Sequence, residues 1–214
     1  MGTDRPSGTE GYAEEAASLE NLYESIAFAE LHRPVLHLMP PAPATVLDIG
    51  AGTGRDAAAL AALGHQVTAV EPTAALRLGA IARHRSPRIE WLDDSLPELA
   101  RLAGRDGGFD LVMLTAVWMH LDAAQRRQAM PRVARLVREG GVMILSLRHG
   151  PVPPGRRMFE VSADETVTLA AAEGMRPLLR LDHRDGLLQR PGVSWTRLAF
   201  SKAHGKRPRG CGVL

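Results

Sequence analysis

The feature that most constrains the fold is the stretch VLDIGAGTGRDAAAL at residues 46–60. An apolar run ends in an acid, Gly50, Gly52 and Gly54 follow at every second position, and an alanine-rich segment continues with the composition of a helix. Glycine adopts positive φ and lets a ligand approach the backbone, but it loses more conformational entropy on folding than any other residue. This spacing therefore predicts a tight turn between a strand and a helix, with a ligand lying against the main chain.

Short apolar runs and helical segments alternate along the rest of the chain. We expect strands near residues 45–49, 66–70, 88–92, 109–114 and 142–147, and helical segments near 15–38, 55–63, 74–84, 95–103 and 123–138. Strands that are apolar along their whole length indicate a parallel sheet covered on both faces. Residues 162–174 predict a capped helix, after which two strands complete the sheet as an antiparallel edge pair. The predicted fold class is α/β, a doubly wound, mostly parallel seven-stranded sheet with an antiparallel C-terminal edge strand.

Length and composition favour one globular domain. The chain has 214 residues, 45% of them hydrophobic and 23% charged, and a formal net charge of +2. We expect a single domain over residues 15–201, a poorly ordered N-terminus at 1–14 and a disordered basic tail at 202–214. The single cysteine, Cys211, excludes an internal disulfide and a cysteine-based zinc cage. Acids in the first thirty residues and the lack of a long apolar run predict a cytoplasmic protein, and the Ala/Arg/Gly-rich composition is typical of a bacterial one.

The glycine spacing argues against a dinucleotide site. The dinucleotide fingerprint is G-x-G-x-x-G, and its third glycine would fall on position 55. The chain has Arg55 there, and its own spacing is G-x-G-x-G. We therefore expect no NAD binding.

The chain resembles the class I S-adenosylmethionine-dependent methyltransferases, a family of Rossmann-like fold, from about residue 19 to residue 201. Five segments carry the resemblance in the family's order: VLDIGAGTG, VTAVEP, WLDDSLPEL, FDLVMLTAVWMHL and LVREGGVMILSL. The resemblance implies that S-adenosyl-L-methionine is the cofactor, that S-adenosyl-L-homocysteine is the product, and that the protein is an enzyme that transfers a methyl group.

The same resemblance assigns roles to residues at the ends of the predicted strands. Asp48 would orient the glycine loop and the cofactor amino group, and Glu71 would accept both ribose hydroxyls, which one carboxylate can do. Either Asp93 or Asp94 would accept from the adenine amino group, and we favour Asp94. The expected cofactor contacts are Tyr23, Asp48, Gly50, Ala51, Gly52, Gly54, Arg55, Asp56, Glu71, Pro72, Asp93, Asp94, Ser95, Leu96, Thr115, Ala116 and Val117.

Several of these residues have structural alternatives. An acid near a helix N-terminus is favourable whatever binds nearby, so Glu71 would also serve to stabilise the helix that follows it. Arg55 and Asp56 either contact the cofactor carboxylate and amine or form a salt bridge on the first helical turn. Tyr23 either covers the cofactor or packs in the core.

The catalytic residue is harder to predict, because alignment of nucleophile and methyl group alone supplies much of the rate. His120 follows the fourth strand and His149 the fifth, so both lie at the ligand edge of the predicted sheet. A histidine pKa of about 6.5 suits a general base near neutrality. The alternative for His120 is packing beneath the following helix.

The acceptor is predicted to be a small molecule. The chain has TAVWMH where nucleobase-amine methyltransferases carry a D/N-P-P-Y/F/W box, and Asp122 alone offers a carboxylate there for a metal, so we expect no metal. The arginine-rich segment 125–139 lacks the aromatics of a nucleic-acid surface, and nothing indicates a membrane partner.

Trp118, Arg148 and Arg156 are the expected substrate contacts. Arg148 and Arg156, with His149 and Arg157, flank the loop after the fifth strand, and arginine forks grip carboxylates and phosphates. An acidic or phosphate-bearing substrate would suit them. The alternatives are a methyltransferase that acts on RNA or protein, and a non-catalytic protein that binds the same cofactor.

Overall fold

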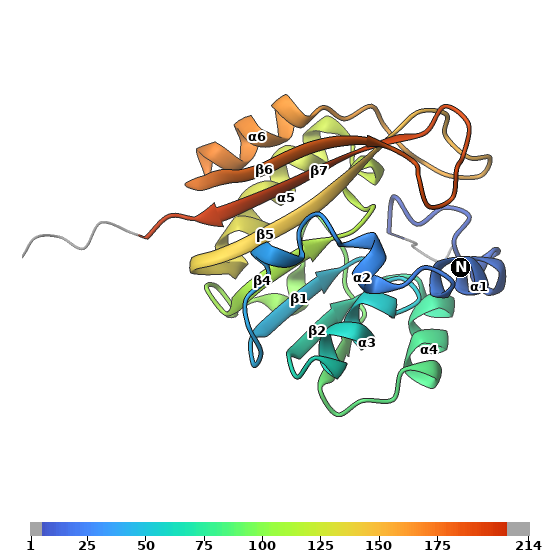
Figure 1. The fold of residues 1–214 in the computed structure, drawn as a ribbon, viewed down its shortest axis with the longest axis horizontal. Coiled ribbons are helices and arrows are strands. Elements are labelled where there is room, and N and C mark those ends of the chain that lie inside the picture. Colours follow the sequence, from blue (N-terminus) through green and yellow to red (C-terminus); the bar gives the residue numbers. More distant parts are fainter. Residues whose placement is uncertain (1–5, 205–214) are drawn as a thin grey trace, which may run out of the picture.

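The computed structural model describes residues 6–204, which form a seven-stranded sheet in the order β3-β2-β1-β4-β5-β7-β6 (Figure 1). Strands β3, β2, β1, β4 and β5 pair in parallel, and β7 pairs antiparallel with both β5 and β6. The predicted fold class is confirmed. The strands are β1 (Thr45–Ile49), β2 (Gln66–Val70), β3 (Ile89–Leu92), β4 (Phe109–Leu114), β5 (Val137–His149), β6 (Met175–Arg184) and β7 (Ser194–Lys202).

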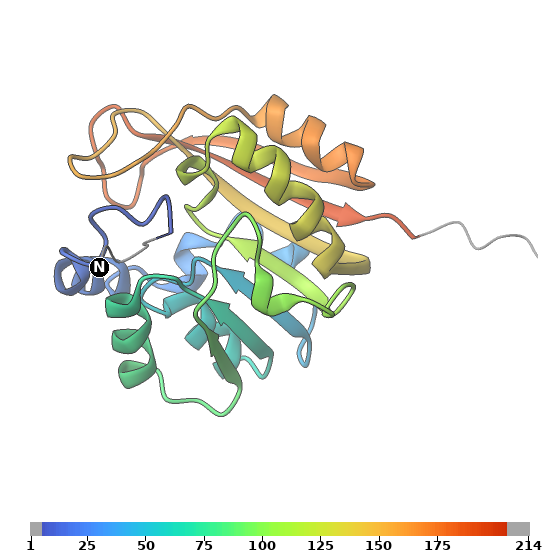
Figure 2. The same cartoon turned by 180° about the vertical axis from the view of Figure 1, so that it is seen from behind.

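Helices cover both faces of the sheet, as Figures 1 and 2 show from opposite sides. Helices α5 and α6 lie on one face, and α2 and α3 lie on the other. The α-helices are α1 (Ala16–Glu24), α2 (Phe28–Leu31), α3 (Arg55–Ala62), α4 (Ala74–Arg83), α5 (Ala123–Leu136) and α6 (Ala163–Ala172). Short 3₁₀ turns are η1 (Leu36–Leu38), η2 (Ala100–Leu102) and η3 (Trp118–His120).

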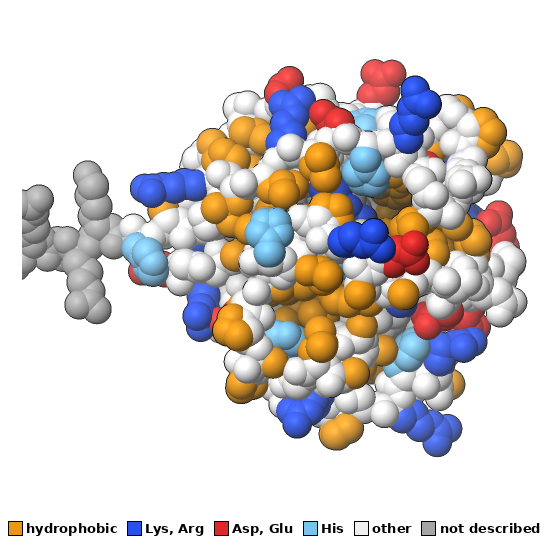
Figure 3. Space-filling view, viewed as in Figure 1, with side chains coloured by type: hydrophobic (Ala, Val, Ile, Leu, Met, Phe, Trp, Pro, Cys, Tyr) orange, Lys and Arg blue, Asp and Glu red, His pale blue; other side chains and the backbone are white. Residues whose placement is uncertain are grey.

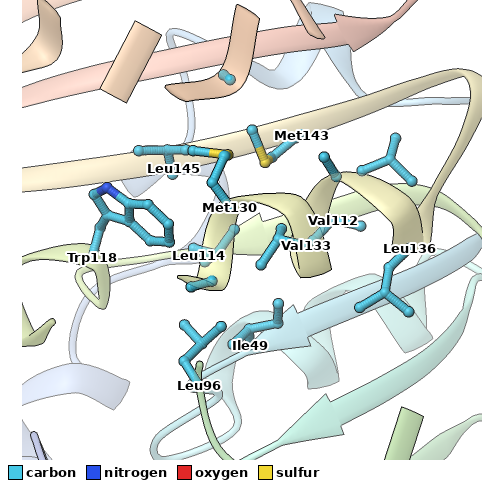
Figure 4. Packing of buried hydrophobic residues seen from close by; sticks show 14 of the residues in the cluster. Ile49, Leu96, Val112, Leu114, Trp118, Met130, Val133, Leu136, Met143 and Leu145 are labelled. Carbon is cyan, nitrogen blue, oxygen red and sulfur yellow. The ribbon is translucent and has the colours of Figure 1, made fainter. Parts of the chain in front are cut away.

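Two apolar clusters form the core, one on each side of the sheet. Neighbouring residues of β1 point to opposite faces, so Val46 joins one cluster and Leu47 the other. Figure 4 shows the larger cluster, where Met130, Val133 and Leu136 of α5 pack against side chains of β4 and β5. This packing holds the carboxyl ends of the parallel strands along one edge of the molecule.

Helix boundaries follow the capping residues. Asp122 and Gln125 form a reciprocal capping box at the start of α5. Ser162 accepts a hydrogen bond from the Glu165 N–H at the start of α6, and Gly174, at φ 74°, follows the end of that helix. The predicted start and stop of α6 are therefore confirmed.

Two predicted helices are wrong in extent. The segment 15–38 divides into α1, α2 and η1, because Ala27 is extended at ψ 137° and ends the helical run. The segment 95–103 keeps only η2, since Leu99 has a φ of 47° and the chain turns there. Asp94 accepts backbone N–H groups of this turn, as described below, which a regular helix would have paired internally.

Residues 1–5 and 205–214 lie outside the described range, and so do most of the tail expected at 202–214 and Cys211. Lys202 is the last residue of β7, one position beyond the predicted end of the domain. No helix within residues 6–204 is long and apolar enough to span a membrane.

Candidate active site

A cavity of about 690 Å³ lies where the carboxyl ends of β1, β2 and β4 meet α1 and the last residues of β5. This volume is in the range of small-molecule and cofactor sites. The edge hairpin of β6 and β7 and the segment before α1 also contribute to its walls. Figure 3 shows the face seen in Figure 1, where apolar side chains lie among basic ones over the middle of the molecule.

The three glycines of the loop have different structural reasons. All have positive φ, at 71°, 57° and 86° for Gly50, Gly52 and Gly54. A Cβ on Gly50 would collide with the side chain of Val117, and one on Gly54 would lie 2.8 Å from Trp91. A Cβ on Gly52 would find no atom nearer than the Gly50 oxygen at 4.0 Å. Only Gly52 therefore leaves room for a ligand, and the other two glycines allow close packing within the protein.

Glu71 joins the end of β2 to the glycine loop. Its Oε2 accepts the Gly52 N–H at 2.9 Å, and its Oε1 accepts the Thr73 N–H at 2.7 Å at the start of α4. Burial raises the pKa of Glu71, and these two hydrogen bonds oppose the rise. The carboxylate also borders the cavity. Glu71 thus supports the loop and the helix start while its remaining lone pairs face the ligand space.

Asp48 is a buried acid without a partner. Its side chain makes no hydrogen bond within residues 6–204, its Oδ2 is shielded from solvent, and only 1% of the residue is exposed. Burial raises the pKa of Asp48, and the nearby carboxylates of Asp56 and Glu71 raise it further. A buried carboxylate of this kind costs free energy unless a cation or donor pairs with it. Asp48 borders the cavity, so a cationic ligand group would satisfy it.

Asp56 lies at the centre of a polar network on the first turn of α3. It accepts from His32 Nε2 at 2.8 Å, from Arg55 Nε at 2.8 Å and from Thr115 Oγ1 at 3.0 Å. Burial alone would raise the pKa of Asp56, but His32 and Arg55 hold it well below its usual value. The structure thus contains the salt bridge that was the alternative to cofactor contact for Arg55 and Asp56. Both residues also border the cavity, and Arg55 donates to the Tyr23 carbonyl at 3.2 Å.

The two candidate adenine acids have different environments. Asp93 pairs with Arg77 at 2.8 Å, its side chain is 57% exposed, and it does not border the cavity. Asp94 borders the cavity and accepts backbone N–H groups of Ser95, Ala100 and Arg101 at 2.9, 3.2 and 2.8 Å. Asp94 therefore shapes the turn that brings Ser95 and Leu96 to the cavity wall.

The comparisons with known proteins agree with this geometry. Residues 46–141 match the sequence profile of a family described as a methyltransferase domain. Human glycine N-methyltransferase is 27% identical over 193 residues, which cover 72% of this chain and 63% of that protein. Trans-aconitate 2-methyltransferase of an Azoarcus strain is 29% identical over 136 residues, covering 63% and 51%.

Among solved structures, Burkholderia thailandensis 1,6-didemethyltoxoflavin-N1-methyltransferase, which holds 1,6-didemethyltoxoflavin and S-adenosylhomocysteine, has a TM-score of 0.72 and 21% identity. The match covers 90% of this chain and 86% of that one. The chain is thus similar to known methyltransferases in the segment 46–141 and in its overall fold. It spans between 55% and 63% of the length of the glycine N-methyltransferases that it matches.

S-adenosyl-L-methionine, the cofactor that the resemblance implies, fits the chemistry of the cavity. The unpartnered Asp48 suits a cationic amino group, Glu71 keeps free acceptor capacity for hydroxyls, and the space beside Gly52 admits a ligand to the backbone. In residues 6–204, no group of three or more His, Cys, Asp and Glu side chains is placed to hold a metal ion.

Most of the other predicted site residues border the same cavity. These are Tyr23, Ala51, Pro72, Thr115, Ala116, Val117, His120, Arg148 and Arg156.

Four predicted site residues do not border the cavity: Gly54 and Asp93, described above, and Trp118 and His149. Trp118 is 1% exposed and lies in the core, with Met130, Leu114 and Leu145 around it in Figure 4, so it is not a substrate wall. The predicted contact with substrate is wrong because η3 directs the indole ring into the core, toward Met130 of α5. His149 shares a hydrogen bond of 2.9 Å with Thr196 Oγ1 of β7 and does not border the cavity either.

His120 does border the cavity, and its hydrogen bonds define its tautomer. The Arg157 carbonyl lies 2.8 Å from Nδ1, and a carbonyl only accepts, so Nδ1 carries a hydrogen. Nε2 is then the acceptor for the Tyr12 hydroxyl, 3.0 Å away. Burial lowers the pKa of His120 and favours the neutral ring. The arrangement leaves an imidazole lone pair available for a proton that arrives through Tyr12.

Residues 6–14, which lie in the stretch 1–14 that we expected to be poorly ordered, contribute to the walls of the site. The Arg156 guanidinium lies 4.1 Å from the centre of the Tyr12 ring and pairs with Glu15 at 2.7 Å. Residues 6–14 thus contact the loop after β5, and Tyr12 is a site residue that sequence reasoning missed. The sequence around it is polar and glycine-containing, so it has no periodic signal.

Proposed function

We propose that this protein transfers the methyl group of S-adenosyl-L-methionine to a nucleophile on a small-molecule acceptor and releases S-adenosyl-L-homocysteine. The observation that carries the proposal is the unpartnered Asp48 beside the open space at Gly52. A protein that used this loop for packing alone would have no reason to keep a buried, uncompensated carboxylate there.

Three groups would hold the cofactor. Asp48 would pair with the amino group and Glu71 with the ribose hydroxyls, since both acids border the cavity at the ends of neighbouring strands. The turn from Asp94 to Leu96 would meet the adenine ring. The bound cofactor supplies an electrophilic methyl group on a sulfonium.

His120 and Tyr12 would remove the proton from the acceptor. The phenol oxygen takes the proton of the nucleophile while its own proton passes to Nε2 of His120, which ends as an imidazolium. The Arg157 carbonyl holds the ring by its other nitrogen and stabilises the charged form. This assigns the predicted catalytic role to His120 and adds Tyr12.

The volume of the cavity and the relatives support a small acceptor. The names of the matched proteins specify glycine, trans-aconitate and 1,6-didemethyltoxoflavin as their substrates, all small molecules. Residues of the segment before α1 line part of the cavity, and its volume of about 690 Å³ suits a cofactor together with a small metabolite.

Calorimetry tests the cofactor, and label transfer tests the activity. S-adenosyl-L-homocysteine should bind at micromolar strength or better, and NAD should not bind. Incubation with methyl-labelled cofactor and fractions of a metabolite extract should label a small-molecule fraction. Binding of NAD in preference to S-adenosyl-L-homocysteine would refute the proposed cofactor. Cofactor binding with label found only in RNA or protein fractions would refute the small-molecule acceptor.

A further inference from the structure

We propose that the methyl acceptor carries an oxyanion, a carboxylate or a phosphate, and that Arg148 binds it. The inference rests on the proposed function and names the substrate class of the same site.

Arg148 belongs to a polar wall formed by the last residues of β5 and by β7. It pairs in register with Trp195, and two residues earlier Ser146 pairs with Arg197. Alternate residues of a strand share a face, so these four side chains lie on one side of the sheet. All four border the cavity.

The Arg148 side chain is buried without an acidic partner. The residue is 8% exposed, its Nε has no hydrogen-bond partner, and its one hydrogen-bond contact within residues 6–204 is the Met158 sulfur at 4.0 Å. Arginine is rarely buried unless it is paired, and a buried cation with only a thioether beside it is strongly under-satisfied. An oxyanion in the cavity would supply the missing acceptors through the planar guanidinium fork.

Neighbouring arginines are already neutralised. Arg156 pairs with Glu15 at 2.7 Å, and Arg190 pairs with Asp185 at 2.6 Å. Asp185 also accepts from the Trp195 indole at 3.3 Å, so it is engaged away from Arg148. Arg33 and Arg184 also border the cavity without an ion pair among the described residues, but both are exposed to solvent. Arg148 is therefore the buried arginine at this end of the cavity whose charge is left for a ligand.

The surroundings of Arg148 place it on the acceptor side of the cavity. Among the groups that act most strongly on its charge are Arg190 and Asp185 of the β6–β7 hairpin, Tyr12 of the segment before α1, and Tyr23 of α1. Arg197, the other buried arginine of the wall, donates to the Leu31 carbonyl at 2.6 Å and interacts with Asp56 at the start of α3. Arg197 thus faces the loop end, whereas an anion on Arg148 would lie near the Tyr12 and His120 pair.

The test uses the full chain saturated with S-adenosyl-L-homocysteine and three probes of similar size: benzoate, phenyl phosphate and the neutral benzamide. We expect calorimetry to show that at least one anionic probe binds ten times or more tightly than benzamide. Arg148→Gln should lose at least tenfold of that affinity, and Arg180→Gln, which removes an exposed charge paired with Asp164, should keep it. The preferred anion identifies the group as carboxylate or phosphate. Equal binding of benzamide, no anion binding to the unchanged protein, or full binding to Arg148→Gln would overturn the inference.

Two further measurements separate this inference from the proposed function. Arg148→Gln should bind S-adenosyl-L-homocysteine as the unchanged protein does. Weakened cofactor binding would mean that Arg148 serves the cofactor, which overturns the inference alone, whereas no cofactor binding to the unchanged protein would overturn the proposed function. Arg148→Met should raise the melting temperature without ligand, because it removes an unpaired buried charge. A lowered melting temperature would show that Arg148 has a structural partner and would contradict the inference.

Discussion

The hydroxyl of Tyr12 lies 3.0 Å from Nε2 of His120, although 108 positions separate the two residues along the chain. The contact brings the segment before α1 to the end of β4 and gives the histidine its only side-chain partner within residues 6–204. Both groups border the cavity, so the contact gives the proposed proton transfer its geometric basis.

The first prediction concerns pH. Burial lowers the pKa of His120, so the neutral ring persists below the ordinary value of about 6.5. The acid limb of kcat/KM should therefore lie below pH 6.5. His120→Gln should lower kcat by about a hundredfold or more and remove that limb, since a positioned base contributes about 10² to 10⁴.

His120 also makes the stability of the folded protein depend on pH. In the pH range between the lowered folded value and about 6.5, the unfolded chain binds more protons, so His120 costs stability as the pH falls through that range. His120→Gln should make melting temperature less dependent on pH there. An acid limb that is unchanged in His120→Gln would rule out the histidine as the base.

The second prediction concerns the glycine loop. Gly52→Ala should abolish binding of S-adenosyl-L-homocysteine. The added Cβ would project into the open space beside the loop, which is the space that we propose the ligand fills. Gly104→Ala is the matched control: Gly104 also has positive φ, at 80°, and nothing within 4 Å of an added Cβ. Each substitution should cost about 1–2 kcal/mol of unfolding free energy for the left-handed backbone. Calorimetry and melting curves should show equal destabilisation and loss of binding in Gly52→Ala alone.

The third prediction concerns the ribose. Glu71→Gln discards the charge and places an amide N–H₂ toward the backbone N–H of Gly52 or Thr73, so melting temperature should fall. Affinity for S-adenosyl-L-homocysteine should fall about ten- to a hundredfold, at about 1.4 kcal/mol per decade. Asp93→Asn, outside the cavity, should leave the affinity unchanged. A lowered melting temperature with normal affinity would leave Glu71 as a structural acid.

The fourth prediction concerns Asp48. The pKa of Asp48 is raised in the folded chain. The acid therefore lowers the stability of the ligand-free protein at pH values above about 3.9, the usual pKa of an aspartate. This loss of stability becomes smaller as the pH falls toward about 3.9. Asp48→Asn should raise the melting temperature of the ligand-free protein at pH 7, with a smaller gain at pH 5. It should also weaken cofactor binding at least tenfold. Should Asp48→Asn melt lower than the unchanged chain at pH 7, the acid would have a structural partner.

The sheet, and the edge of it at which a ligand would bind, can be predicted from the sequence alone. The apolar runs alternate with helical segments, and this alternation predicts a parallel sheet because such strands are buried on both faces. Glycines, Asp48 and Glu71 come at the ends of consecutive strands, so their neighbourhood follows from topology alone. These features are local in the chain or repeat at a fixed period, which is why they can be recognised without coordinates.

The contacts of the individual side chains, in contrast, depend on the tertiary structure. Gly50 and Gly54 resemble Gly52 in sequence, but Val117 and Trp91 occupy the space beside them. Trp118 turned to the core, the predicted helix at 95–103 became a turn around Asp94, and Tyr12 came to His120 from a segment without periodicity. Arg148 and Arg156 are both arginines near the end of β5, yet of the two only Arg156 pairs with an acid. That acid is Glu15, the residue before α1, which is 141 positions away in the sequence. Such pairings depend on distances across the fold, and no local pattern in the chain encodes those distances.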